Sequence, residues 1–506
     1  MNFQVIRNLI GKILVLVGLL MIIPLITAFV YSENIKNIIS YLIPMSGLII
    51  IGLILGYVKP AKNTSMGARE GYVIVSLSWL LMALFGCLPF IISGYVKDFF
   101  TAFFEMASGF TTTGASALTA EELSNMLNNG AHSLLMWRSF SHWIGGMGIL
   151  VFILAIILES KDGSSLHILR AESPGPQVGK IVSKMKISSR ILYLIYIALT
   201  LLEIAILNIC HIFDPEMTFF DSLIISFGTA GTGGFATTTL SVGLYAPCCQ
   251  YVVATFMIIF GVNFSIYYWL IIKNFKDILH NDELKAYLIT VILAVTIITI
   301  QITSIYTTFE EGFRHAYFQV ASIISTTGYS TTDYWTEPGR WPSLSLGILL
   351  VLMFVGSCAG STAGGLKQSR VLIIAKYSKS KVKSMISPRR VDVIRLDGKP
   401  LDNKVVESTV AFFILYVVIL VACALLISIW NPNMGEFEED PLTMFTASLS
   451  CISNIGPGLG AVGPAGGFAN FSWFSKLILT FEMIAGRLEL YPILILFNRS
   501  TWKKST

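Results

Sequence analysis

Ten apolar runs dominate this sequence, and most are long enough to cross a bilayer as helices. They lie near residues 10–31, 38–57, 71–95, 134–158, 190–213, 251–273, 285–307, 342–379, 403–430 and 472–498. One helical crossing needs about 20 apolar residues, so the runs predict ten spans with both termini on one side. Only 13 % of the residues are charged, against about a quarter in soluble domains. We therefore predict an all-α polytopic membrane protein rather than a soluble chain with one large core.

The start of the chain has some features of a signal peptide, because Arg7 and Lys12 precede the apolar run Ile13–Tyr31. That run is long for a signal peptide and lacks a clear cleavage site of small residues. A retained first helix is therefore favoured.

Charged residues in the connections predict how the spans are oriented. The segment 367–404 carries eleven Lys or Arg against three Asp, and the connections after the second, fourth and sixth runs are also basic. These connections share one side with both termini, whereas acidic residues such as Glu121, Asp221 and Glu310 fall on the other side. Basic loops mark the cytoplasmic side. Both termini are therefore expected in the cytoplasm, and the basic stretch is expected to contact membrane lipids.

Four short glycine-centred turns recur on the acidic side, after the third, fifth, seventh and ninth runs. They cover residues 111–115, 231–235, 326–329 and 454–457. The segment before each turn is too short to span a membrane, and we expect it to be a half-helix that enters from outside. These half-helices are predicted at residues 98–110, 217–229, 311–325 and 440–452. A unit of span, half-helix, turn and span thus repeats four times after two N-terminal spans, which predicts a pseudo-fourfold arrangement.

The composition of the turns suits backbone that must leave a helix and present its carbonyl oxygens to a polar species. A ring of carbonyls can replace the water shell of an alkali cation. The half-helices would help, because their C-terminal ends carry partial negative charge. The alternative is that each turn is a plain loop with glycine as a helix stop. That alternative suffices for one turn but is weaker for four in equivalent positions.

These turns resemble the filters of the Trk/Ktr/HKT superfamily of potassium transporters, especially its TrkH-type subunits. The resemblance covers nearly the whole chain, including the two N-terminal spans. It implies a bacterial inner-membrane protein with K+ as the bound and transported ion, held by backbone carbonyls of the residues before each filter glycine. The filter residues that it implies are Thr112, Thr113, Gly114, Gly231, Thr232, Gly233, Thr326, Thr327, Gly328, Asn454, Ile455 and Gly456.

Two of the turns differ from the family pattern. The second contains the double glycine Gly233-Gly234, which leaves its register open by one residue. The fourth, with Asn454 and Pro457, is the least similar to the others. Plant relatives that favour sodium carry serine in place of the first filter glycine, so Gly114 points to potassium.

A glycine-rich run interrupts the eighth apolar run. Each glycine destabilises a helix by about 1 kcal/mol relative to alanine, and irregular backbone at membrane depth persists only inside protein or beside water. A helix interface of small residues is the alternative. Arg487 lies in the last run and is a functional candidate, although Glu482 or Glu489 could pair with it. In the family, such a loop and arginine restrict the pore below the filter, which implies the gate residues Gly356, Gly360, Ser361, Thr362, Gly364, Gly365, Lys367 and Arg487.

The family resemblance also implies partners. A homodimer with one pore per chain is expected, and a peripheral nucleotide-binding ring of the TrkA type would dock on the cytoplasmic side. The chain itself is not expected to bind nucleotide, because the glycines at 458, 460 and 463 lack the strand and helix of a dinucleotide fingerprint. Neither an organic cofactor, nor nucleic acid, nor enzymatic activity is expected, and the seven cysteines show no metal-ligand spacing.

We therefore predict five segments: an N-terminal pair of spans in 1–70 and pore repeats in 71–160, 161–283, 284–402 and 403–506, with a gating loop at 356–366. The predicted function is gated potassium uptake. The alternative is a symporter coupled to H+ or Na+. Glu203 and Glu407 are its candidate proton sites, although a polar contact within the bundle explains each better, and His142 is expected to be structural. A membrane scaffold or enzyme in which the four turns are plain loops is the third hypothesis.

Overall fold

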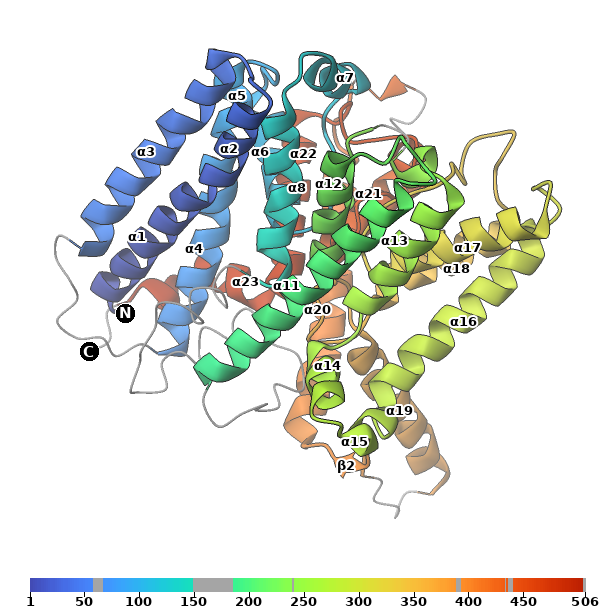
Figure 1. The fold of residues 1–506 in the computed structure, drawn as a ribbon. Coiled ribbons are helices and arrows are strands. Elements are labelled where there is room, and N and C mark those ends of the chain that lie inside the picture. The colour runs from blue at the N-terminus through green and yellow to red at the C-terminus, as the bar shows by residue number, and fades with distance from the viewer. Residues whose placement is uncertain are drawn as a thin grey trace.

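The computed structural model describes residues 1–57, 67–148, 185–238, 241–387, 393–432, 434–435 and 440–503 (Figure 1). Regular structure in these residues is almost entirely helical. The strands β1 (Arg395–Leu396) and β2 (Lys399–Pro400) form one short antiparallel hairpin. The predicted all-α class is confirmed. The second half of the run 134–158 and the boundary expected at 160–161 lie outside the described residues.

The first two predicted spans form a closely packed pair. α1 (Phe3–Leu20) continues into α2 (Ile22–Val30) as one apolar stretch, and α3 (Ile35–Tyr57) packs along α1. A Cβ added to Gly11 would clash with the backbone nitrogen of Gly56. The lack of side chains at such positions lets two helices approach closely, a packing mode common within membranes.

The remaining elements follow one order four times: a long helix, a short interior helix, a turn and a further helix. The first set is α4 (Ala68–Gly86), α5 (Leu88–Ser93), α6 (Phe99–Phe110), α7 (Ala120–Asn128) and α8 (His132–Gly146). The second set is α11 (Met185–Cys210), α12 (Phe219–Gly231), η1 (Ser241–Leu244), α13 (Pro247–Phe260), α14 (Phe264–Ile271) and α15 (Phe275–Leu279). The third set is α16 (Asp282–Ile302), α17 (Phe309–Ile324), α18 (Ser343–Val355) and α19 (Gln368–Ile386). The fourth set is α20 (Asn403–Ile427), α21 (Pro441–Ser453), η3 (Gly460–Val462), α22 (Trp473–Arg487), α23 (Tyr491–Phe497) and η4 (Arg499–Trp502).

The short interior helices α6, α12, α17 and α21 correspond to the four predicted half-helices. They contain 12, 13, 16 and 13 residues, too few to span a bilayer. Each begins with a side chain that accepts hydrogen bonds from the first helical turn. These caps are Asp98, Thr218, Thr308 and Asp440. The caps satisfy N–H groups that have no partner within the helix, and they stabilise helices that are short for their environment.

The ten predicted spans are not all continuous helices. In the described part of the chain, six helical stretches are long and apolar enough to cross a membrane. The sixth predicted span is bent by 91° between α13 and α14, so an uninterrupted span at 251–273 is wrong. The last predicted span breaks after Arg487, because Glu489 and Leu490 have positive φ values and leave helical geometry. The eighth is interrupted between α18 and α19, where the glycine-rich run lies.

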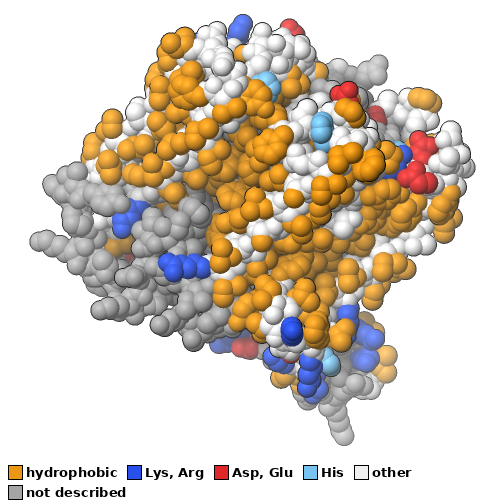
Figure 2. Space-filling model, viewed as in Figure 1, with side chains coloured by type: hydrophobic (Ala, Val, Ile, Leu, Met, Phe, Trp, Pro, Cys, Tyr) orange, Lys and Arg blue, Asp and Glu red, His pale blue; other side chains and the backbone are white. Residues whose placement is uncertain are grey.

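The surface matches a multi-pass membrane protein. Figure 2 shows a broad hydrophobic band across the middle of the molecule, with Lys and Arg gathered at the end that holds α14 and α15. Carboxylates lie towards the opposite end, near α17. The first and last described residues lie side by side, because the N-terminal amine of Met1 donates to the carbonyl oxygen of Lys503 over 3.4 Å.

Candidate functional site

Within two residues after the end of each interior helix lies a residue with left-handed backbone geometry. The residues are Thr112, Thr232, Thr326 and Asn454, with φ values of 57°, 57°, 57° and 55°. Left-handed geometry is uncommon for residues with a side chain, costs about 1–3 kcal/mol per residue, and clusters at functional sites. Four copies at equivalent helix ends therefore mark one designed feature rather than four chance turns.

Hydrogen bonds fix the register of the four turns. In each turn, the N–H of the left-handed residue donates to the carbonyl three positions back, and the next N–H donates to the carbonyl five positions back. Gly234, two residues after Thr232, is therefore equivalent to Gly114. By position in the turn, Gly234 rather than Gly233 corresponds to Gly114, Gly328 and Gly456. The two residues before the equivalent glycine are Thr232 and Gly233, not Gly231 and Thr232.

The four turns meet one another in a closed ring. A Cβ added to any of the four equivalent glycines would approach the backbone of the next turn too closely. In order around the ring, the pairs are Gly114 with Gly234, Gly234 with Thr327, Gly328 with Ile455, and Gly456 with Thr113. Backbone thus packs directly against backbone at every junction, which only residues without a Cβ permit.

A single cavity opens above this ring. Its volume is about 700 Å³, and all four equivalent glycines, Gly114, Gly234, Gly328 and Gly456, line it. The carboxylate-bearing residue Asp333 also lines it. The residues that directly precede the glycines are not part of the lining. The arrangement is a vestibule whose lining includes the four equivalent glycines of the ring.

The two adjacent glycines of the second turn, Gly233 and Gly234, are each required by a different neighbour. Gly234 packs against the third turn, whereas a Cβ on Gly233 would clash with the imidazole ring of His142. That ring is fully buried, lies 2.8 Å from the carbonyl oxygen of Gly109 through Nδ1, and packs on Phe235 with 4.3 Å between ring centres. His142 therefore supports the second turn from behind, as expected for a structural residue.

The fourth turn differs from the others because asparagine replaces threonine. The side-chain Nδ2 of Asn454 donates to the hydroxyl of Thr113 over 3.0 Å and to the carbonyl of Met483 over 2.8 Å. The side chain therefore joins the fourth turn to the first turn and to α22. Asn454, which makes the sequence of the fourth turn differ from the others, thus cross-links the fourth turn to the first.

The interrupted span contributes a loop at residues 356–367. The loop contacts the turn residues that precede the glycines, so it lies across the ring from the cavity. The N–H of Gly364 donates to the hydroxyl of Thr326 over 2.7 Å, and the N–H of Gly365 donates to the carbonyl of Ser453 over 2.9 Å. Backbone with positive φ shapes the loop at Gly356, Gly360, Gly365 and Lys367.

Arg487 links this loop to α8. Its guanidinium donates to the carbonyl oxygens of Thr362 and Gly146, each over 2.7 Å, and to that of Gly145. Two other residues of the predicted gate have partners within the loop itself. The Ser361 hydroxyl donates to the carbonyl of Cys358, and the Lys367 ammonium donates to that of Ala363.

The acidic neighbours that could have paired with Arg487 have other partners. Glu489 forms an ion pair with Arg370, and Glu482 accepts a hydrogen bond from the Ser448 hydroxyl over 2.6 Å. Arg487 therefore places a guanidinium group between this loop and α8.

The ion pair between Arg138 and Glu105 was not predicted from the sequence. The two side chains are 2.5 Å apart and almost fully buried. Arg138 also donates to the carbonyl of Ala236 over 3.0 Å, and Glu105 accepts from the N–H of Ala117 over 2.8 Å. The pair thus fastens the chain after the first turn to the chain after the second. The only signal available in the sequence was an arginine within the fourth apolar run.

The geometry defines a class: an all-α membrane protein whose one chain encloses a ring of four equivalent helix-ending turns. Comparison with known proteins agrees. A family model described as TrkH, cation transport protein, matches residues 42–504. The chain belongs to the TrkH family of cation transport proteins.

Individual relatives are similar over their whole length. The Trk system potassium uptake protein TrkH of Salmonella typhimurium is 31 % identical over 510 residues, and that of Escherichia coli K12 is 30 % identical, with 100 % of each chain covered in both cases. The crystal structure of the potassium transporter TrkH from Vibrio parahaemolyticus superimposes with a TM-score of 0.85 at 28 % identity, covering 99 % of this chain and 100 % of that one.

Proposed function

We propose that this protein takes up potassium across the cytoplasmic membrane through the ring of four turns. The observation that carries the proposal is the closed ring of equivalent backbone beside one vestibule. The relatives named above are potassium uptake proteins. The proposed ligands are the backbone carbonyls of Thr112, Thr113, Thr232, Gly233, Thr326, Thr327, Asn454 and Ile455. Carbonyls in such a ring replace the hydration shell of the ion.

The C-terminal ends of α6, α12, α17 and α21 favour a cation at the same place. These ends carry partial negative charge, and all four terminate at the ring. Asp333 in the vestibule adds a full negative charge on the side from which the ion would enter. Both effects raise the local concentration of cations without discriminating among them. Selectivity in this proposal rests on the spacing of the carbonyls.

We further propose that the loop at 356–367 and Arg487 form the gate. The loop bonds to Thr326 and Ser453 directly below the ring, and Arg487 holds the loop against α8. A positive charge at this depth opposes the passage of a cation. Opening would require the carbonyl contacts of Arg487 to break or to move with the loop.

The gate connects to the basic end of the molecule through α19, which begins at the end of the loop. This end would face the cytoplasm, with both termini there. A TrkA-type nucleotide-binding ring docked on this surface would move α19 and so the loop. The proposed assembly is a homodimer with one pore in each chain. Crosslinking in native membranes tests it, and the appearance of monomers alone would exclude it.

Ion flux in proteoliposomes tests the central proposal. The purified chain is reconstituted, and uptake is compared with potassium, sodium or a large organic cation as the only permeant species. Uptake should be fastest with potassium and absent with the organic cation. Equal rates for all three would show that the ring does not select, and the proposal would fail.

A symporter coupled to H+ or Na+ is the second candidate. The observation in its favour is the carboxyl group of Glu203, which is fully buried on α11 beside the interior helix α12. A carboxyl group at membrane depth is a candidate proton site. Glu407, by contrast, is exposed on α20. The reversal potential of the current separates the two candidates: a shift with a pH gradient at fixed potassium supports symport, and no shift supports a channel.

A further inference from the structure

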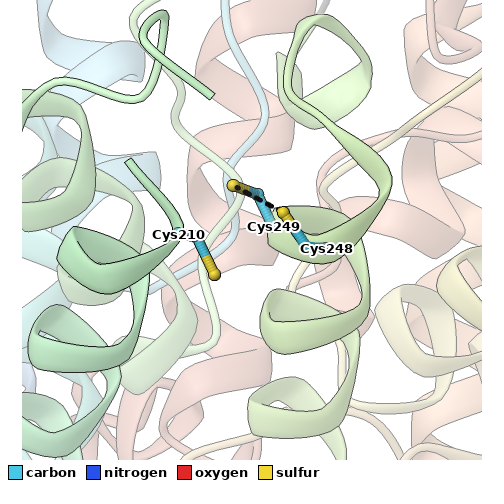
Figure 3. A group of neighbouring side chains, drawn as sticks. All are labelled: Cys210, Cys248 and Cys249. Carbon is cyan, nitrogen blue, oxygen red and sulfur yellow. Dashed lines mark hydrogen bonds between the residues drawn. The ribbon is translucent and has the colours of Figure 1, made fainter. Parts of the chain in front are cut away.

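Three cysteines that are scattered in the sequence lie together at the vestibule end of the molecule. Cys210 is the last residue of α11, and Cys248 and Cys249 lie in the first turn of α13 (Figure 3). Their sulfur atoms all lie within 4.8 Å of one another, and those of Cys248 and Cys249 are 4.0 Å apart. All three are free thiols. The sequence showed no metal-ligand spacing because helix packing, not chain proximity, assembles the group.

A fixed carboxylate lies next to the cluster. Oδ2 of Asp214 lies 3.7 Å from the sulfur of Cys249 and accepts a hydrogen bond from the N–H of Ala246 over 2.6 Å. Its Oδ1 accepts from the N–H of Glu216 over 3.2 Å. Asp214 is only 6 % exposed, so the loop holds this carboxylate in one orientation beside the thiols. The carboxylate is thus positioned beside the sulfur of Cys249, one member of the three-thiol group.

We propose that Cys210, Cys248, Cys249 and Asp214 bind one thiophilic divalent cation of the Zn2+ and Cd2+ class. Tetrahedral sites with zinc–sulfur bonds of about 2.3 Å place their sulfurs roughly 3.8 Å apart, which the observed separations approach without backbone movement. Soft thiolate ligands select such ions over potassium or magnesium. Binding displaces the thiol protons to water as each metal–sulfur bond forms.

The position of the site makes it accessible to an ion and allows the bound ion to connect two helices. Cys249 is fully buried and Cys210 is 8 % exposed, whereas Cys248 is partly exposed and offers the first ligand. A bound ion would cross-link the ends of α11 and α13. These two helices flank the interior helix α12. The site is separate from the proposed potassium path, so it does not depend on that proposal.

Cadmium binding to the full-length protein tests the site. The protein is purified with a reductant that does not chelate metals, and Cd2+ is titrated while the ultraviolet sulfur-to-cadmium charge-transfer band is recorded. One Cd2+ should bind per chain with that band, and proton release should accompany it. The Cys249→Ser and Asp214→Asn variants should bind at least about tenfold more weakly. Asp214→Asn retains all three thiols, so it probes the carboxylate alone.

A matched control separates the site from general thiol chemistry. Cys87→Ser removes another buried thiol, whose sulfur donates to the carbonyl of Leu84 at a helix end, and it should bind Cd2+ like the parent protein. Binding should also raise the melting temperature of the parent and of Cys87→Ser but not of Cys249→Ser. Unchanged affinity in Cys249→Ser, or binding without the charge-transfer band, would overturn the proposal.

Discussion

The backbone N–H of Gly364 donates to the side-chain hydroxyl of Thr326 over 2.7 Å, which joins the loop of the interrupted span to the third turn of the ring. Thr326 is also the left-handed residue of that turn. One residue therefore sets the geometry of the ring and anchors the loop beneath it. The bond from Gly365 to the carbonyl of Ser453 extends the same anchorage to the fourth turn.

Replacing Thr326 with valine should release the loop while leaving the ring in place. Valine keeps the shape of threonine but offers no acceptor to Gly364, and an unsatisfied buried N–H costs about 1–3 kcal/mol. We expect a several-fold higher potassium flux in proteoliposomes with unchanged preference for potassium over sodium. Thr290→Val, which removes a hydroxyl bonded only within its own helix, is the control and should have no effect. A loss of selectivity without a change in flux would contradict the assignment.

Replacing Arg487 with glutamine should raise the flux of potassium. The substitution removes the positive charge below the ring and weakens the contacts to Thr362 and Gly146. An increase of about tenfold corresponds to a barrier lower by about 1.4 kcal/mol. Single-channel or liposome flux measurements detect such a change. Arg499→Gln, at an exposed position near the C-terminus, should behave like the parent. Equal flux in both variants would remove Arg487 from the gate.

Replacing Gly114 with serine should impair potassium selectivity and uptake. The new Cβ would meet the backbone of Gly234, and a φ of 75° already disfavours any residue with a side chain. We expect uptake to fall at least about tenfold, with a barrier increase of the order of 1.4 kcal/mol or more. Gly347→Ala adds a methyl group where no atom lies within 4 Å, and it should be silent. Normal uptake and selectivity in Gly114→Ser would end the pore hypothesis.

The register of the second turn predicts a rescue experiment. Gly233→Ala clashes with the ring of His142, whereas Gly234→Ala clashes with the backbone of the third turn. A second substitution, His142→Ala, removes the first obstacle but not the second. Potassium uptake should therefore recover in Gly233→Ala/His142→Ala relative to Gly233→Ala. Uptake should stay low in Gly234→Ala/His142→Ala. Rescue of the Gly234 variant instead would mean that the register is wrong.

The buried pair between Arg138 and Glu105 should contribute strongly to stability. Glu105→Gln leaves the guanidinium without a negative partner, and breaking a buried pair in this way costs roughly 3–5 kcal/mol. The exposed pair of Arg314 with Glu310 serves as the control, because Glu310 is 55 % exposed and such pairs contribute about 0–1 kcal/mol. Thermal unfolding of the purified variants measures both. Equal melting temperatures for Glu105→Gln and Glu310→Gln would refute the special role of the buried pair.

Sequence patterns predicted the helical class and the four half-helices well, because apolar length and glycine turns are local signals. The breaks at α13–α14 and after Arg487 were harder to predict. Both lie inside apolar runs, where hydropathy alone cannot distinguish a bent helix from a straight one. Tertiary contacts set these bends.

The candidate site shows the same division between local and distant signals. The turns themselves were visible in the sequence, but the double glycine left the register of the second turn open by one residue, with Gly233 assigned as its filter glycine. The choice depends on which glycine contacts His142 and which contacts the third turn. Likewise, Arg138 and Glu105 are 33 residues apart, and only the folded chain brings them together.

Closure of the ring by one chain has a consequence for how the pore can vary. A pore built from four identical subunits receives every mutation in four places at once. In this chain, each quadrant is encoded separately, so Asn454 can replace threonine in one quadrant and cross-link it to its neighbour. The loop likewise forms hydrogen bonds to Thr326 in the third quadrant and to Ser453 in the fourth. Because one chain encodes all four quadrants, each quadrant can acquire its own role. The third and fourth quadrants bind the loop, and the first and second complete the ring.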